Sequence, residues 1–339
     1  MSTIRAHLIG DIHMSDRHMA LTKEAMANTI EYVRSNKDVD FICVMGDIFD
    51  THRTLKLDHR NVAIDFINAL SEIRPTIVII GNHDRMNNRD YMSDIHPFYG
   101  MSNIRNKLYI VSKPTVLRFG SKNCVMFVPY VPPGRFKEAI DTCIESLRKN
   151  GAISTIHDLS LICAHQEFYG VSYGPVASKI GDRWPKEYPM VVSGHIHHRH
   201  WLQDNIYYTG SLYPITMSES TDKGVITITY HVATKKMDIK CTRVVEEGKR
   251  TFHIKASDDT AVMEMLTLER ENTRYIVSGT QDEIAAIKSK IGKNKSINWV
   301  PDVTVPNVTV STGTFDEMLK KRITDEDVAK LLEHIMADE

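Results

Sequence analysis

The stretch TIVIIGNHD, from Thr76 to Asp84, decides how the first half of this chain folds. Its first five residues are apolar or β-branched without interruption, a pattern typical of a strand buried on both faces. Gly81 lets the backbone turn sharply and approach a ligand closely, and three polar side chains follow it, Asn82, His83 and Asp84. The stretch therefore predicts a buried strand whose carboxyl end carries a polar site.

Four other stretches repeat this arrangement, with an apolar run that leads directly into His or Asp. Because ligands of open α/β sheets bind beyond the carboxyl ends of the strands, we expect all five polar segments to meet at one edge. The four segments are Gly10-Asp11-Ile12-His13, Gly46-Asp47, Ala164-His165 and Gly194-His195-Ile196-His197, after expected strands at Ile4 to Ile9, Phe41 to Met45, Leu159 to Ala164 and Met190 to Ser193.

Amphipathic stretches alternate with these strands and predict an α/β fold. Helices expected at Leu21 to Ser35 and Leu57 to Ile73 give the chain a βαβαβ opening, in which the sheet is covered on both faces. A third helix is expected at Arg135 to Lys149. Further strands are expected at Leu108 to Val111, Cys124 to Val128 and Ile206 to Thr209, and an antiparallel hairpin at Val225 to Tyr230 and Met237 to Val245.

The residue types in the five segments favour a centre with two metal ions. Residues two apart in extended backbone face the same side, so Asp11 with His13, and His195 with His197, can point at one place. Carboxylate, imidazole and amide ligands together suit divalent ions such as manganese, iron or zinc. A single histidine is usually only a satisfied polar residue. Five segments in order exceed the needs of one ion, whereas two ions about 3.5 to 4 Å apart, bridged by a carboxylate, would use them all.

Length and composition limit the class of protein. The chain has 339 residues, which fits two or three domains, and its 42% hydrophobic and 25% charged residues are typical of globular proteins. Its 42 basic and 43 acidic residues leave no overall positive charge for nucleic acid. The five dispersed cysteines predict reduced thiols. With neither an apolar run of membrane-spanning length nor a signal-peptide pattern in the sequence, we expect a cytoplasmic protein without membrane contact, in the host-cell cytoplasm if it is viral.

The five segments resemble the pattern of the calcineurin-like metallophosphoesterases: DxH, GD, GNHD, a strand-end His, and GHxH. This resemblance implies a β-sandwich flanked by helices and two divalent ions, Mn²⁺ first, with Mg²⁺, Fe²⁺ or Zn²⁺ as alternatives. It implies that Asp11, His13 and His197 hold one ion, that Asn82, His165 and His195 hold the other, and that Asp47 bridges them.

The resemblance also implies a histidine beside the scissile phosphate that does not hold metal, here His83. A side chain that titrates near neutrality suits hydrogen bonding to a phosphate oxygen or protonation of the departing alkoxide. Either Asp84 or Asp50 is expected to orient this ring.

Within the superfamily, the segment Gly46-Asp47-Ile48-Phe49-Asp50 is similar to the DNA-repair nucleases of the SbcD type and their phage relatives. Weaker similarities are Gly210-Ser211 and Glu246-Glu247-Gly248-Lys249-Arg250, and the short chain resembles a phage version. Some members of this branch carry a histidine where this chain has Asp50, with His52 nearby, which leaves the means of positioning DNA open. The resemblance implies exonuclease activity on duplex ends or endonuclease activity on single strands, a homodimer, and an SbcC-type coiled-coil ATPase as partner in DNA repair and recombination.

Three domains are expected. A nuclease domain would cover residues 1–248, a small α+β capping domain that faces DNA residues 249–311, and a C-terminal helical hairpin for docking the ATPase residues 312–339. In the capping domain, strands are expected at Thr251 to Lys255 and Arg274 to Ser278, and helices near Ala261 to Glu271 and Gln281 to Ile291. Its candidate phosphate contacts are Lys288, Lys290, Lys293 and Lys295, although a solvated lysine-rich turn explains them equally well.

Two other functions remain open. One is hydrolysis of a small phosphodiester or phosphomonoester by the same two-metal chemistry, and activity on nitrophenyl phosphates without activity on DNA would favour it. The other is a DNA-end clamp that cleaves little, and its mark would be end binding that persists when His83 is replaced.

Overall fold

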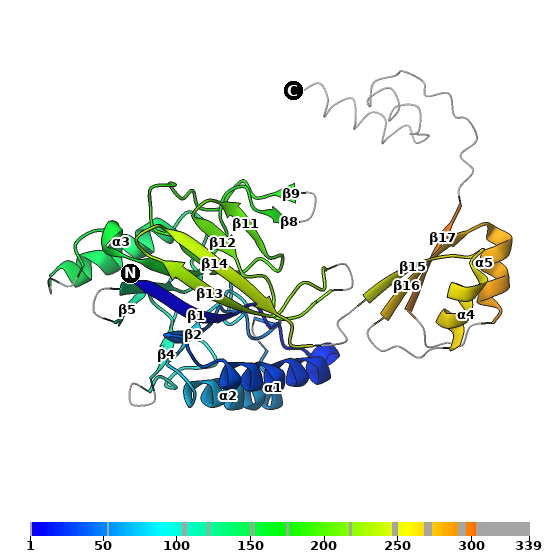
Figure 1. Cartoon of the computed structure of the whole chain (residues 1–339), viewed down its shortest axis with the longest axis horizontal. Helices are drawn as coiled ribbons and strands as arrows, with labels where there is room; N and C mark the ends of the chain where they lie inside the picture. The colour runs from blue at the N-terminus through cyan, green and yellow to red at the C-terminus, as the bar shows by residue number, and fades with distance from the viewer. Residues whose placement is uncertain are drawn as a thin grey trace, which may run out of the picture.

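A computed structural model describes residues 2–52, 54–103, 107–120, 123–149, 151, 153–173, 176–216, 219–245, 250–267, 273–290 and 296–302 of the chain. The described part forms a large body and a small module that follows it (Figure 1). The α/β fold class expected from the sequence is confirmed, because both parts combine largely parallel sheets with helices. The expected helices of residues 312–339 lie outside the described residues.

The large body contains two sheets that pack face to face. The first has the strand order β14-β13-β1-β2-β3-β4 and the second β11-β12-β10-β7-β6-β5. The first consists of β1 (Thr3–Ile9), β2 (Phe41–Val44), β3 (Thr76–Ile79), β4 (Leu108–Val111), β13 (Val225–His231) and β14 (Lys236–Thr242). The second consists of β5 (Thr115–Phe119), β6 (Asn123–Val128), β7 (Leu161–His165), β10 (Val191–Gly194), β11 (His200–Gln203) and β12 (Ile206–Tyr208).

Each sheet has parallel strands at its centre, as the continuous apolar runs predicted. Strands β1 to β4 run parallel, and β13 and β14 extend that sheet as an antiparallel hairpin. In the second sheet β12, β10, β7 and β6 run parallel, with β11 and β5 antiparallel at the edges. Parallel strands end at the same edge, so the residues after β1, β2 and β3, and those after β7 and β10, lie at two neighbouring edges.

Three hydrophobic layers hold the large body together. Apolar side chains from both sheets, among them Leu8 of β1 and Phe127 of β6, form the middle layer. Helices α1 (Met19–Ser35) and α2 (Leu57–Ser71) cover the outer face of the first sheet (Figure 1). Helix α3 (Phe136–Arg148) covers the second sheet. Short elements complete this body: η1 (Asp16–His18), η2 (Ile156–Asp158) and the two-stranded ribbon of β8 (Ser172–Tyr173) with β9 (Val176–Ala177).

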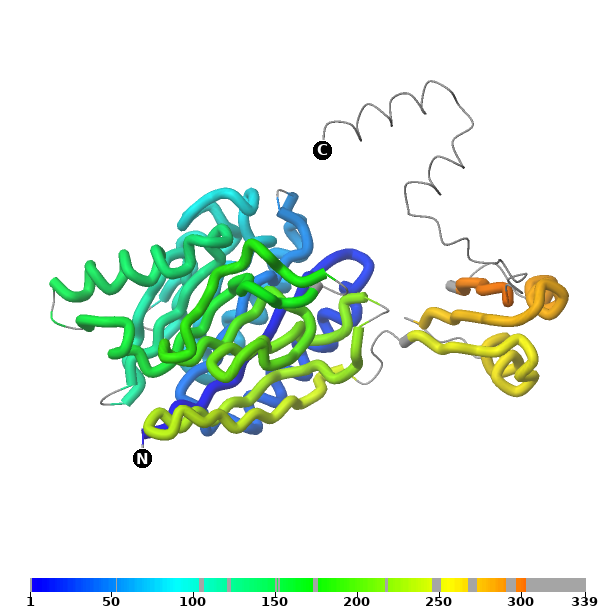
Figure 2. Tube along the Cα trace, turned by 90° about the horizontal axis from the view of Figure 1, so that it is seen from above, coloured from blue at the N-terminus to red at the C-terminus, as the bar shows by residue number. Residues whose placement is uncertain are grey.

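The small module consists of β15 (Arg250–Lys255), α4 (Asp259–Thr267), β16 (Thr273–Gly279), α5 (Gln281–Lys288) and β17 (Ser296–Pro301). Its three strands are all parallel, so it is built from two βαβ units rather than from the α+β arrangement expected. It has a small core of its own, which includes Ile254, Val277 and Ile284. Figure 2 shows it as a separate body beside the sandwich.

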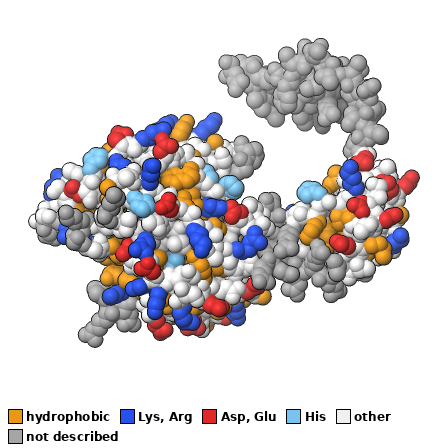
Figure 3. Space-filling view, in the orientation of Figure 1, with side chains coloured by type: hydrophobic (Ala, Val, Ile, Leu, Met, Phe, Trp, Pro, Cys, Tyr) orange, Lys and Arg blue, Asp and Glu red, His pale blue; other side chains and the backbone are white. Residues whose placement is uncertain are grey.

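The surface and the thiols agree with the composition. On the face shown in Figure 3, basic and acidic side chains are interspersed rather than gathered by sign. All five cysteines are free, as expected. In the described part of the chain no helix combines the length and the apolar composition needed to cross a bilayer.

A candidate metal centre at the ends of both sheets

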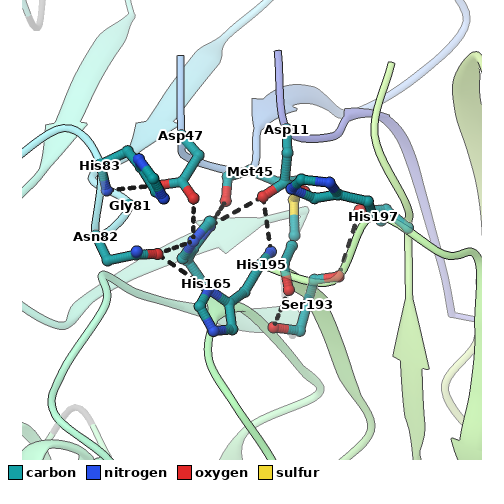
Figure 4. Close-up of polar contacts among 12 residues, drawn as sticks. Asp11, Met45, Asp47, Gly81, Asn82, His83, His165, Ser193, His195 and His197 are labelled. Atoms are coloured by element: carbon teal, nitrogen blue, oxygen red, sulfur yellow. Dashed lines mark hydrogen bonds and ion pairs between the residues drawn. The ribbon is translucent and has the colours of Figure 1, made fainter. Parts of the chain in front are cut away.

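The five polar segments meet where the carboxyl ends of the two sheets come together (Figure 4). The loops after β1, β2 and β3 carry the side chains from the first sheet, and β7 and the loop after β10 carry those from the second. The side chains are Asp11, His13, Asp47, Asn82 and His83 from the first sheet and His165, His195 and His197 from the second. The structure therefore brings together the seven expected ligands and His83.

The first group consists of Asp11, His13 and His197, whose ligand atoms all lie within 4.8 Å of one another. The Nε2 atoms of His13 and His197 are only 3.0 Å apart. Asp11 is fully buried; its Oδ1 accepts a hydrogen bond from the backbone N–H of His195, while its Oδ2 has no hydrogen-bond partner among the described residues. A buried carboxylate oxygen without a donor is expensive unless a cation neutralises it.

The second group consists of Asp47, His165 and His195, with the amide oxygen of Asn82 among them. This oxygen lies 3.0 Å from Nε2 of His165 and 2.9 Å from Nδ1 of His195. Burial, and then the charge of His165, lower the pKa of His195 to about 3, so this ring is neutral at physiological pH. A neutral imidazole is the form that binds a metal ion.

Asp47 lies between the two groups. Its Oδ2 is 3.2 Å from Nε2 of His165 and 3.6 Å from Nε2 of His13. Burial alone would raise the pKa of Asp47, but the neighbouring His165 and His13 hold it far below the usual carboxyl range. Burial likewise opposes protonation of His165, and Asp47 outweighs this effect and raises the pKa of His165 to about 9. Asp47 is therefore an ionised carboxylate within reach of both groups.

Three rings are fixed by acceptors on the side that faces away from the centre. Nδ1 of His165 donates to the carbonyl of Met45 at 2.7 Å. Nδ1 of His13 lies 3.3 Å from a carboxylate oxygen of Asp50, and Nδ1 of His197 lies 3.3 Å from one of Glu219. In a neutral ring, a proton held on Nδ1 leaves the Nε2 lone pair directed inward, which is the usual outer arrangement around a metal-binding histidine. In His165, whose pKa is raised, a bound cation would displace the proton on Nε2. This set of atoms fits divalent metal ions.

Glu219 is itself held in place by Lys223, whose buried ammonium group also donates to the carbonyl of His197. Burial would raise the pKa of Glu219, but His197 and Lys223 lower it to about 2. The sequence analysis missed Glu219 and Lys223 because no motif spacing marks them. It missed the carbonyl of Met45 because a backbone atom leaves no sign in the residue type.

His83 lies at the edge of this centre. Its Nδ1 donates to the backbone carbonyl of Asp50 at 2.9 Å, and its backbone N–H donates to Asp47. Its ring stacks on that of His52, with centroids 4.5 Å apart and planes 17° apart. Burial lowers the pKa of His83. Asp50 thus holds the His83 ring through its backbone, while its side chain faces His13.

Asp84 does not occupy the place expected for it beside the His83 ring. Its buried carboxylate accepts hydrogen bonds from the backbone N–H groups of Ile48 and Phe49 at 3.0 and 3.2 Å, and from that of Gly81 at 3.1 Å. Burial, and then the charge of Asp47, raise the pKa of Asp84 to about 6. Asp84 thus joins the loop after β2 to the loop after β3, and its role is to position both.

Several backbone positions in the centre are in conformations that proteins rarely adopt. His13, Asp47 and His195 have φ angles of 48°, 50° and 80°, in the left-handed region. Such strain gathers at functional sites, where the surrounding structure holds it in place. A Cβ atom on Gly81 would lie 2.2 Å from Oδ1 of Asp47, and one on Gly46 would lie 2.5 Å from Nδ1 of His165. Glycine is needed at these two positions because the backbone there lies too close to a neighbouring segment to leave room for a side chain.

The described lysines proposed for DNA contact, Lys288 and Lys290, lie in the small module. The ammonium group of Lys288 lies 5.2 Å from the centroid of the Trp299 ring, a cation–π contact within the module. Lys290 follows the end of α5, and Lys293 and Lys295 lie outside the described residues.

Comparisons with known proteins agree with this geometry. The family model described as calcineurin-like phosphoesterase matches residues 4–199, more than half of the chain and all five motifs. The chain belongs to this family. It is 32% identical over 295 residues to "Putative phosphoesterase 078R" of Invertebrate iridescent virus 3, covering 83% of this chain and 78% of the relative. It is 31% identical over 300 residues to "Putative phosphoesterase 244L" of Invertebrate iridescent virus 6, covering 88% of this chain and the whole relative.

Membership gives the convergent side chains a chemical context. The calcineurin-like phosphoesterases hydrolyse phosphate esters with divalent metal ions, and the two groups around Asp47 are the candidate ligands for those ions here. The β-sandwich flanked by helices, expected from the motif resemblance, is the fold observed.

Proposed function

We propose that this chain is a metal-dependent DNA nuclease of the SbcD type, which hydrolyses phosphodiester bonds at duplex ends or in single strands. The observation that carries the proposal is the pair of ligand groups on either side of Asp47, which belongs to one group and lies 3.6 Å from His13 of the other, with His83 beside them. The segment from Gly46 to Asp50 supports the choice of DNA as the substrate, because it is similar to that of the repair nucleases.

The residues of this chain have separable tasks in the reaction. Two divalent ions, with Mn²⁺ as the first choice, would neutralise phosphate charge and supply a nucleophile near neutral pH. The side chains of Asp11, His13 and His197 would hold one ion, and Asn82, His165 and His195 the other. Asp47 would contact both, because its carboxylate lies between the groups.

His83 would serve the phosphate rather than a metal ion. With its Nδ1 proton donated to the carbonyl of Asp50, its Nε2 is the nitrogen left to exchange a proton with the substrate. The lowered pKa makes the protonated ring a stronger acid, so it would give its proton readily to the departing oxygen. His52 would keep this ring in one plane by stacking on it.

The test is cleavage of end-labelled duplex and single-stranded DNA by the purified chain with manganese, with magnesium and with a chelator. We expect metal-dependent cleavage that His83→Ala lowers by about a hundredfold or more, the scale typical of lost acid–base catalysis. A matched control is His198→Ala, which removes a nearby histidine outside both ligand groups.

The same experiment separates the other functions. Hydrolysis of nitrophenyl phosphates without cleavage of DNA would contradict the nuclease and support a small-phosphoester hydrolase. Binding of DNA ends that survives His83→Ala, with no cleavage by the intact protein, would support a clamp.

We also propose an SbcC-type ATPase partner, a homodimer and a host-cytoplasm location. Loss of co-purification with the ATPase on deletion of residues 312–339 tests the docking site.

A further inference from the structure

A cavity of about 740 Å³ opens beside the metal centre. One wall is formed by residues Met14 to His18, which follow β1, and another by the segment between β2 and α2. Asp50 belongs to this second wall, and it also contacts both His13 and His83. The cavity therefore begins where the scissile phosphate would lie under the proposed function.

The small module contributes one residue to this cavity, Arg274 of β16. No carboxylate forms an ion pair with it within the described ranges, and its buried Nε–H has no hydrogen-bond partner there. A buried donor without an acceptor is uncommon in proteins, and this one is free to donate to an oxygen of a ligand in the cavity. The planar guanidinium group matches the oxygens of a phosphate.

A second guanidinium group lines the same cavity. Arg17 is exposed there, and none of the ion pairs in the described part of the chain includes it. The acidic Asp16 close by is already paired, because it forms an ion pair with Lys56, and its Oδ1 lies 3.0 Å from Nε2 of His59. Two cations thus remain available to an anion.

The rest of the lining is suited to an organic group. Met14 and Phe49 are buried, and Leu55 and Ile215 add apolar surface, while Thr51 adds a hydroxyl group. A volume of this size is in the range of pockets for ligands much larger than a single phosphate. Apolar walls with two unpaired guanidinium groups fit a nucleoside that carries a phosphate.

We propose that this cavity binds the nucleotide adjoining the scissile phosphate, and that Arg274 and Arg17 contact the next phosphate of the same strand. The inference rests on the proposed function and deepens it, because it assigns a substrate subsite to which both the sandwich and the small module contribute. Arg274 is then a specificity residue that favours a polynucleotide over a simple ester.

The test uses matched chromogenic esters of thymidine. The 5′-(p-nitrophenyl phosphate) is compared with and without a 3′-phosphate, and the 3′-(p-nitrophenyl phosphate) with and without a 5′-phosphate. We expect the extra phosphate to lower KM about tenfold or more in one of the two pairs, the scale of one charge-assisted contact. Arg274→Ala should abolish that preference, and Arg274→Lys should restore part of it.

The controls separate a local effect from a fold defect. Lys255→Ala removes an exposed cation of the same module outside the cavity, and Arg34→Ala is the matched control for Arg17→Ala on the neighbouring helix. Both should keep the wild-type preference. Rates on bis(p-nitrophenyl) phosphate, an ester with no second phosphate, should equal the wild-type rates in both control variants. Equal KM values within both thymidine pairs would overturn the proposal.

A failure of the proposed function is recognised separately. If the wild type cleaves none of these esters with metal ions, calorimetry with thymidine 3′,5′-bisphosphate on the chelator-treated protein tests the cavity alone. Binding that Arg274→Ala weakens about tenfold supports the subsite. Absence of binding overturns it.

Discussion

Three of the rings that face the metal centre have an acceptor beside the nitrogen on their far side. Met45, Asp50 and Glu219 supply the outer acceptors for His165, His13 and His197. Gly46 and Gly81 leave room for the His165 ring and the Asp47 carboxylate, because a Cβ atom at either glycine would overlap with these side chains. The centre is thus determined as much by backbone conformation as by the residues that would hold metal.

Asp47→Asn tests the residue placed between the two groups. The amide keeps the volume but loses the charge within reach of both His165 and His13, so we expect metal content to fall by at least one ion per chain. Phosphoesterase activity should fall about a hundredfold or more, because both ions are needed to stabilise the transition state. Metal analysis after gel filtration gives the stoichiometry. Asp65→Asn, an exposed carboxylate on α2, should keep full metal content.

Gly81→Ala tests the close approach of the loops after β2 and β3. The added Cβ would meet the Asp47 carboxylate, so the loops must separate, and we expect a loss of metal together with about 1 to 3 kcal/mol of stability. Urea denaturation and metal analysis measure the two effects. In Gly120→Ala the new Cβ meets nothing within 4 Å although φ is +64°. That variant should lose about 1 kcal/mol and no metal.

At the scale of elements, a buried histidine joins β1 to α1 and β13. His7 donates from Nε2 to the carbonyl of Asn36 at 2.7 Å, and its Nδ1 accepts from the hydroxyl of Thr227 at 2.9 Å. The neutral ring satisfies both contacts when its proton is on Nε2. Burial lowers the pKa of His7, although the bond to Asn36 partly opposes the shift.

The pH dependence of stability follows from that lowered pKa. The unfolded chain takes up a proton on His7 near pH 6.5, whereas the folded chain does so only at lower pH. The contribution of neutral His7 is therefore complete above pH 6.5 and is lost as pH falls from 6.5 through the folded-state pKa. Replacement by Gln should remove this component from urea-unfolding curves between pH 7 and 5. An NMR titration that places the His7 pKa above 6.5 would contradict the assignment.

The strands and helices of the sandwich were predictable where burial leaves a strong pattern. Continuous apolar runs located β1, β2, β3, β7 and β10, and with them the ends that carry the site. The strands β5, β11 and β17 were not predicted. They are half-exposed and mix polar with apolar residues, so their sequences lack the clear alternation of apolar and polar residues that indicates a strand. The expected ligand residues could be chosen from motifs, but Glu219 reaches His197 through a loop whose path only tertiary structure determines.

At the scale of the whole molecule, the near-zero net charge bears on how the chain would bind DNA under the proposed function. If Arg17 and Arg274 supply the main phosphate contacts of the isolated chain, binding should depend only weakly on salt. We expect a slope of about −2 for log K against log salt concentration, since each contact contributes about −0.9. Fluorescence anisotropy with duplex DNA measures it. A slope near −6 would point to a basic surface outside these two residues.

Each ligand group draws on both sheets, and this arrangement has a mechanical consequence. Asp11 and His13 follow the first sheet while His197 follows the second; likewise Asp47 and Asn82 follow the first, and His165 and His195 the second. Every bound ion would therefore link the two sheets of the sandwich to each other. We expect the melting temperature to rise with metal concentration, because only the folded chain binds the ions. In Asp47→Asn this rise should be smaller. Solvent exchange of amides at the sheet edges should slow on loading, so a chelator would loosen the sandwich at the point where substrate enters.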